Sequence, residues 1–268
     1  MIDWIFIGIL CSILFSLSCQ SKKNKSTPVA EIKEAVQQKI DSIEHWYNNE
    51  WLPIASGGTE AQMHRAFGNG RKIYKQIEWA VEFFFPQTAK ELNGAPLPEI
   101  EPEENMVIAP SGFQVIEALI YPFAETNRTR LLQESKKLTS VLHRLQILWH
   151  EHQFRDDQVF VACRLQVMRI TSLSLAGFDT PLSLTAIQEV SFSLKGVQTA
   201  ISAYEQVQHL QLFDSIYTMI RGAADFISEH KHFESFDRAF FIGSYLQPLA
   251  NWFFILQYKL NLKPPNIY

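Results

Sequence analysis

Each of Arg71, Tyr74, Lys75, Glu78 and Glu82 lies three or four residues from another member of the set. Positions with these spacings share one face of a helix, so the five side chains form a polar stripe. Such a stripe is most often a solvated face with weak surface ion pairs. The more specific alternative is that the stripe forms a buried network that faces Glu117 across a helical bundle. If Glu78 and Glu117 converge there, they make a carboxylate site for a metal ion or an arginine.

Gln114 and Glu117 also lie three residues apart, in a short apolar segment that should be helical from Ser111 to Tyr121. Ser111 and Gln114 fit a capping box, in which the glutamine closes the start of the helix. The other interpretation is a polar binding site formed by Gln114 and Glu117. The candidate binding residues are therefore Gln114, Glu117, Glu78, Arg71 and Tyr74.

The remaining residues with reactive side chains favour neither a metal site nor nucleophilic catalysis. His150 and His152 point about 200° apart on a helix and cannot chelate one ion together. His143 and His150 share a face, but no third ligand is placed by the sequence. Cys163 lies in an apolar segment and is predicted to be a small buried hydrophobic residue. No glycine motif for phosphate or dinucleotide binding and no nucleophile elbow occurs, so we assign no catalytic residue and no metal ligand.

Composition excludes some classes of protein. The 268 residues are 47% hydrophobic and 13% aromatic, which is enough for a large core. A formal charge of -4 and a pI of about 6.1 provide no basic surface field, so nucleic acid is not an expected partner.

The amino terminus has the pattern of an export signal. Residues 1–18 contain an uncharged apolar run that is too short for a comfortable membrane span. Ser16-Leu17-Ser18-Cys19 and the polar residues after it look like a bacterial lipoprotein junction. We therefore expect a signal peptide at 1–18, lipidation at Cys19 and a tether at 19–27. This places the folded part in the envelope of a Gram-negative bacterium, facing the periplasm and anchored in a membrane by lipid.

Only Cys163 remains in the folded part, because Cys11 belongs to the signal and Cys19 carries the lipid. No intramolecular disulfide is then possible. The cysteines never form C-x-x-C-H, so c-type haem cannot be attached covalently to this chain.

Apolar residues recur at helical spacing through most of the remaining chain, beginning at Thr27-Pro28. Thr59 and Gln62 form a capping box at the start of the next helix. Residues 86–110 form an acidic, proline-rich excursion that we expect to be extended. No period-2 alternation indicates a sheet. The predicted class is all-α, with two packed four-helix bundles at 28–154, which includes the excursion, and 155–268.

Three stretches carry a family resemblance, and together they cover nearly the whole mature chain. They are Arg71–Phe85 with Leu92–Ile100, Pro110–Pro122, and Gly177–Pro181 with Phe233–Phe241. They resemble the N-terminal helical domain of Bacteroidetes-type di-haem cytochrome c peroxidases, in which a haem domain follows. Gly112-x-Gln114-x-x-Glu117 is also similar to the G-x-H-x-x-E signature of imelysin-like proteins, with glutamine in place of histidine.

The peroxidase resemblance implies a non-catalytic accessory lipoprotein that docks on a di-haem peroxidase or another envelope redox protein. Such a module should expose an apolar patch around the proline-rich excursion. Without a haem motif, peroxidase activity is not expected of this chain alone. The imelysin-like alternative implies periplasmic handling of iron or haem, with a pocket where Glu117 meets carboxylates or histidines. Iron or haem is an expected cofactor only under that alternative.

Overall fold

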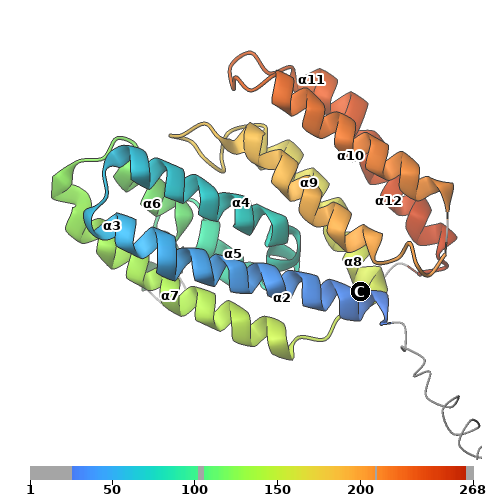
Figure 1. Ribbon diagram of the computed structural model, residues 1–268, viewed down its shortest axis with the longest axis horizontal. Helices are drawn as coiled ribbons and strands as arrows, with labels where there is room; N and C mark the ends of the chain where they lie inside the picture. The colour runs from blue at the N-terminus through green and yellow to red at the C-terminus, as the bar shows by residue number, and fades with distance from the viewer. Residues whose placement is uncertain (1–25, 102–105, 209, 264–268) are drawn as a thin grey trace, which may run out of the picture.

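The computed structural model describes residues 26–101, 106–208 and 210–263 (Figure 1). The predicted signal peptide, Cys19 and most of the tether lie outside these residues. Within them, helices provide almost all regular structure, which confirms the all-α class. The predicted boundary between two bundles near Phe154 stays a prediction. One cluster of buried apolar side chains extends through both halves of the chain.

The first helices begin where the sequence signals predict. Helix α2 (Pro28–Trp46) has Thr27 as its N-cap, with proline in the first turn. A π-helical turn, η1 (Tyr47–Trp51), and α3 (Leu52–Gly57) continue it. Helix α4 (Glu60–Phe84) begins with the predicted capping box of Thr59 and Gln62.

Residues 86–110 differ from the expected extended excursion. Pro86 begins a helix, α5 (Pro86–Asn93), because proline suits the first helical position and because Ala89 and Leu92 are buried against the bundle. Two short antiparallel strands, β1 (Glu99–Glu101) and β2 (Met106–Ile108), follow, with Ile100 opposite Val107. This short ladder leaves the all-α class unchanged. Strands of three residues are too short to show an alternating pattern.

The other elements follow in chain order, and their bounds are these: α6 (Phe113–Ile120), η2 (Glu125–Asn127), α7 (Arg128–Glu151), α8 (Asp156–Arg169), η3 (Ile170–Ser174), α9 (Ala186–Ser202), α10 (Gln211–Glu229), α11 (Arg238–Phe241), η4 (Ile242–Leu246) and α12 (Gln247–Lys259). Helix α4 contacts α2, α5 and α6 as well as α8 and α9. Figure 1 shows it lying between the helices drawn in blue and green and those drawn in yellow and orange.

Helices α4 and α9 approach each other closely because one face of α9 carries small residues. Ala186, Ser193, Gly196 and Ala200 are spaced by three, four and seven residues, and the structure buries this row. A methyl group at Gly196 would overlap the carbonyl oxygen of Gln76 on α4. The short distance brings the polar side chains of α4 within reach of α9.

The last helical region contains a π-helical turn. Segment η4 separates α11 from α12, and Pro248 lies in the first turn of α12, where a missing N–H is tolerated. Arg238–Lys259 is long and apolar enough to cross a membrane by length and composition alone, with a mean hydropathy of 1.3. Here it packs against α8 and α10.

Candidate functional site

The polar stripe of α4 is buried rather than solvated. Arg71, Lys75 and Glu78 expose at most 1% of their surface. The expectation of a solvated face was wrong, and the stripe is buried; that it faces Glu117 across the bundle stays a prediction. The physical reason is that α5, α8 and α9 pack against α4 and cover the face that carries these side chains.

Lys75 lies at the centre of this network. Its Nζ donates to Oε1 of Glu78 at 2.7 Å and to Oδ2 of Asp179 at 2.9 Å. Burial alone would lower the pKa of Lys75, but the carboxylates of Asp179 and Glu78 outweigh burial and raise it. Burial would raise the pKa of Asp179, yet Lys75, Arg71 and a hydrogen bond from Ser174 hold it well below its usual range. Lys75 and Asp179 are therefore held in their charged forms.

Arg71 joins α4 to α9 and to the end of α5. Its Nε and Nη2 donate to the Glu189 carboxylate, with the shortest distance 2.6 Å, in the two-pronged geometry that suits arginine. Its Nη1 donates to Oδ1 of Asn93. Burial would lower the pKa of Arg71, but the neighbouring Glu189 carboxylate outweighs burial and raises that pKa above its ordinary value. The guanidinium is thus enclosed and paired.

Glu78 and Glu117, the two acids whose convergence the sequence suggested, have different hydrogen-bond partners. Oε2 of Glu78 accepts from Nε2 of Gln166 at 2.7 Å. Oε1 of Glu117 accepts from the main-chain N–H of Ser183 at 2.8 Å and from its hydroxyl at 2.6 Å. Burial raises the pKa of Glu117. The described hydrogen bonds therefore connect Glu78 to α8 and Glu117 to the segment before α9.

Gln114 does not close a capping box, so that interpretation was wrong. Helix α6 begins after Gly112, whose φ of 90° is unfavourable for other residues. The Ser111 hydroxyl donates to the Glu91 carbonyl at 3.0 Å, and Nε2 of Gln114 donates to the Asn93 carbonyl at 3.0 Å. Both side chains satisfy the carbonyls at the end of α5 and dock α6 against it.

The outer end of the network is formed by Arg169, Glu82 and Tyr74. Nη2 of Arg169 lies 2.8 Å from Oε1 of Glu82, and both side chains are 22% exposed. The Tyr74 hydroxyl, fully buried, donates to the same carboxylate at 3.5 Å. Burial raises the pKa of Glu82 to about 7, despite the opposing effect of Arg169. Glu82 therefore holds a proton more readily than an ordinary glutamate does.

Cys163, His150 and His152 have structural roles. Cys163 is buried, as predicted, and burial raises the pKa of its thiol, which makes it a poor nucleophile. The main-chain carbonyls of His150 and His152 accept from Nζ of Lys33. In the part of the chain that the structure describes, no group of three His, Cys, Asp or Glu side chains is arranged to hold a metal ion.

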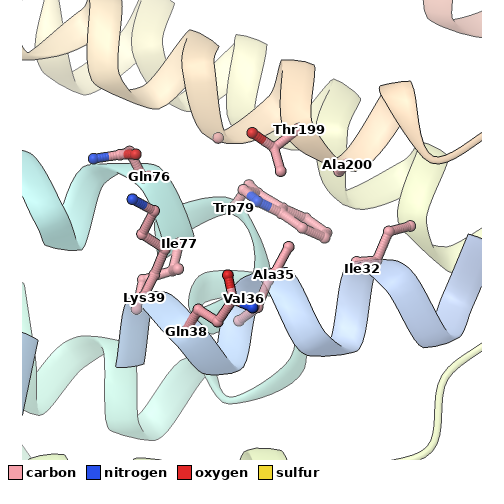
Figure 2. A pocket seen from close by; sticks show the side chains of 11 residues that line it. Ile32, Ala35, Val36, Gln38, Lys39, Gln76, Ile77, Trp79, Thr199 and Ala200 are labelled. Atoms are coloured by element: carbon pink, nitrogen blue, oxygen red, sulfur yellow. The ribbon is translucent and has the colours of Figure 1, made fainter. Parts of the chain in front are cut away.

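Two pockets flank Trp79. The one in Figure 2 has a volume of about 120 Å³ and lies between α2, α4 and α9, with Ile32, Val36 and Thr199 in its lining. The second, of about 400 Å³, lies between α4 and α8 and reaches the outer end of the network.

The sequence matches no family model and no curated protein. Both family resemblances therefore remain predictions.

Several members of the network were missed by sequence reasoning, and they are Asn93, Gln166, Arg169, Asp179 and Glu189. One feature of the sequence could have indicated Glu189, because this acidic residue interrupts the row of small residues on α9. Asp179 lay inside the Gly177–Pro181 turn but had no predicted role.

Proposed function

We propose that the chain is a non-catalytic accessory module of the cell envelope that docks on a redox partner, a di-haem cytochrome c peroxidase in the first instance. The observation that carries this proposal is the exposed apolar surface of the β1–β2 segment. Leu97 and Ile100 are each 71% exposed and Val107 is 69% exposed. This surface lies in the proline-rich excursion, where a docking patch was expected.

The geometry of the two strands suits contact with another protein. Ile100 and Val107 are directly opposite in the antiparallel ladder, so their side chains lie on the same face of it. A two-stranded ladder is marginally stable alone and leaves free edges for a further strand. A groove of about 150 Å³, lined in part by Leu97, Pro98 and Ile108, runs beside it. These features favour docking through β-strand addition or through apolar side chains.

The interior supports a scaffold role rather than a catalytic one. The charged side chains of Arg71 and Lys75 are enclosed and paired with carboxylates. A group already saturated by protein partners has little capacity to bind or activate a substrate. Location in the envelope and lipidation at Cys19 rest on the sequence pattern and belong to the same proposal.

Docking can be measured by titrating the mature chain with the di-haem peroxidase encoded by the same genome, using calorimetry. The double substitution Ile100→Asp with Val107→Asp should weaken binding at least tenfold, about 1.4 kcal/mol, because two carboxylates replace the apolar contact. The matched control is Ile147→Asp on α7, where the side chain is 52% exposed and distant in sequence from the strands. Equal affinities for the strand variant and the native chain contradict the proposal, as does the absence of binding.

Iron or haem handling remains the alternative that the imelysin-like signature implies. It predicts carboxylates or histidines around Glu117, whereas the described partner of Glu117 is Ser183. Titration with ferric iron and with hemin separates the two functions. Tight binding that Glu117→Gln abolishes replaces the docking proposal.

A further inference from the structure

The last helical region presents an exposed row of residues that carries no charge. Exposed positions follow one another there at spacings of three and four residues, and they are Phe240, Gly243, Gln247, Asn251, Phe254 and Tyr258. The Tyr258 side chain is 74% exposed and that of Phe254 is 58% exposed. The solvent side of a surface helix in a soluble protein normally carries charged side chains, so this row is unusual.

Helix α8 extends this surface with exposed apolar side chains of its own. Leu165 is 46% exposed and Met168 is 64% exposed, and α8 packs against α12. The two helices meet at Arg164. Its Nη1 donates to Oε1 of Gln257 at 2.6 Å, and its guanidinium lies 5.9 Å from the centre of the Phe254 ring. The exposed apolar side chains therefore belong to two packed helices with one arginine between them.

The charges around this surface are positive. Residues 158–178, which include most of α8, contain no aspartate or glutamate, and neither do residues 238–263. The basic residues of these two segments are Arg164, Arg169, Arg238, Lys259 and Lys263. Arg169 is paired with Glu82, whereas no ion pair among the described residues joins Arg164 to an acid. The whole chain has a formal charge of -4, so this excess of positive charge is local.

This combination is typical of a helix that lies in the interface of a lipid bilayer. Exposed aromatic and aliphatic side chains enter the headgroup region, and lysine and arginine beside them attract anionic lipids. Tyrosine suits that depth because its ring is apolar and its hydroxyl is polar. A crossing of the membrane does not fit the structure, because Leu249, Phe253 and Leu256 on the other side of α12 are buried in the bundle.

The start of the folded part lies where the proposed lipid anchor brings a membrane close. Cys19 precedes the N-cap Thr27 by eight residues, which span at most about 28 Å. Figure 1 shows the blue start of α2 and the red end of α12 at the same end of the molecule. A lipid at Cys19 therefore holds the end of α12 that carries Lys259 near the bilayer.

We propose that the surface formed by α8 and α12 around Arg164 lies on a lipid bilayer with anionic headgroups. Phe254 and Tyr258 enter the headgroup region, and Arg164 and Lys259 attract the lipid phosphates. Contact along α12 fixes the orientation of the bundle on the membrane. The inference rests on the proposed location in the envelope, but the affinity of this surface for lipid does not require the anchor.

Co-sedimentation with lipid vesicles measures this contact without the anchor. The mature chain with Cys19→Ser is mixed with vesicles of phosphatidylcholine alone or of phosphatidylcholine and phosphatidylglycerol in equal parts. We expect at least about tenfold tighter binding to the anionic vesicles, and most of this difference should vanish in about 1 M salt, where the Debye length is about 3 Å. Absence of binding to the anionic vesicles overturns the inference, as does equal binding to both kinds. Docking on the peroxidase is measured without vesicles, so the two proposals can fail separately.

The double substitution Phe254→Asp with Tyr258→Asp should lower the affinity for anionic vesicles at least about tenfold, because two carboxylates replace the apolar contact. The matched control is Ile147→Asp on α7, where the side chain is 52% exposed. Circular dichroism checks that both variants fold. Undiminished binding by the double variant contradicts the inference. So does light scattering in which this substitution only separates a dimer, because the surface is then an interface between two copies of the chain.

Fluorescence quenching decides the question if the double variant does not fold. Tyr258→Trp places a tryptophan on the proposed surface, and Ile147→Trp places one on α7 as the control. Brominated lipids in anionic vesicles should quench the added tryptophan at 258 and leave the one at 147 unchanged. Equal quenching of the two tryptophans, or quenching of neither, overturns the inference.

Discussion

Lys75→Met should destabilise the protein far more than removal of an otherwise similar lysine. The native ammonium is fully buried between Glu78 at 2.7 Å and Asp179 at 2.9 Å. Methionine fills similar space but removes the ammonium group that lies between the two carboxylates. Removing one partner of a buried ion pair costs about 3–5 kcal/mol, because the remaining charge stays desolvated. In a chain of this size, that loss corresponds to a decrease in Tm of about 6–20 °C.

Lys137→Met is the matched control. Lys137 also pairs with a glutamate three residues away, Glu134, at 2.9 Å, but its side chain is 50% exposed. Such a pair contributes about 0–1 kcal/mol. Urea unfolding monitored by circular dichroism measures both variants, and the double variant Lys75→Met with Asp179→Asn measures the coupling. Equal losses for Lys75→Met and Lys137→Met would refute the reasoning, because the two pairs differ mainly in burial.

Two further predictions concern Glu82 and the contact between α4 and α9. Burial raises the pKa of Glu82 from 4.5 to about 7. The protonated carboxyl group therefore contributes fully to the stability of the fold below pH 4.5, and this contribution is lost as the pH rises through 7. The loss in the free energy of unfolding is on the order of 3 kcal/mol. Urea unfolding at pH 5 and pH 8 should show that loss in the native chain and not in Glu82→Gln, and an equal dependence on pH in both would contradict it. Gly196→Ala should destabilise by about 1–3 kcal/mol because its methyl group overlaps the Gln76 carbonyl, whereas Gly68→Ala, which meets no atom within 4 Å, should stabilise α4 by up to about 1 kcal/mol. Thermal unfolding of both variants is the measurement, and equal shifts would count against the close approach of the helices.

The helical class and several helix starts could be predicted because their signals are local. Thr27-Pro28 and the capping box of Thr59 and Gln62 involve neighbouring residues only. The same is true of the shared face of Arg71, Lys75 and Glu78. Whether that face is buried depends on which helices cover it, and helical spacing contains no such information.

The partners in the network could not be predicted for a related reason. Glu189 is 118 residues from Arg71, and Asp179 is 104 residues from Lys75. Contacts over such distances depend on how the helices pack. The same limit explains why Gln114 was interpreted as a cap, since the carbonyl of Asn93 that it binds belongs to another helix.

The charged contacts between α4 and α9 have a consequence for the choice of helix partners. Apolar stripes of similar width are interchangeable, so a chain with many of them can assemble with its helices shifted by one turn or in a different order. Moving α9 by one turn, about 5.4 Å, would separate Glu189 from Arg71 and leave both charges desolvated. We therefore expect the Arg71–Glu189 pair to fix the register between α4 and α9 and so to favour one packing of the helices over the alternatives.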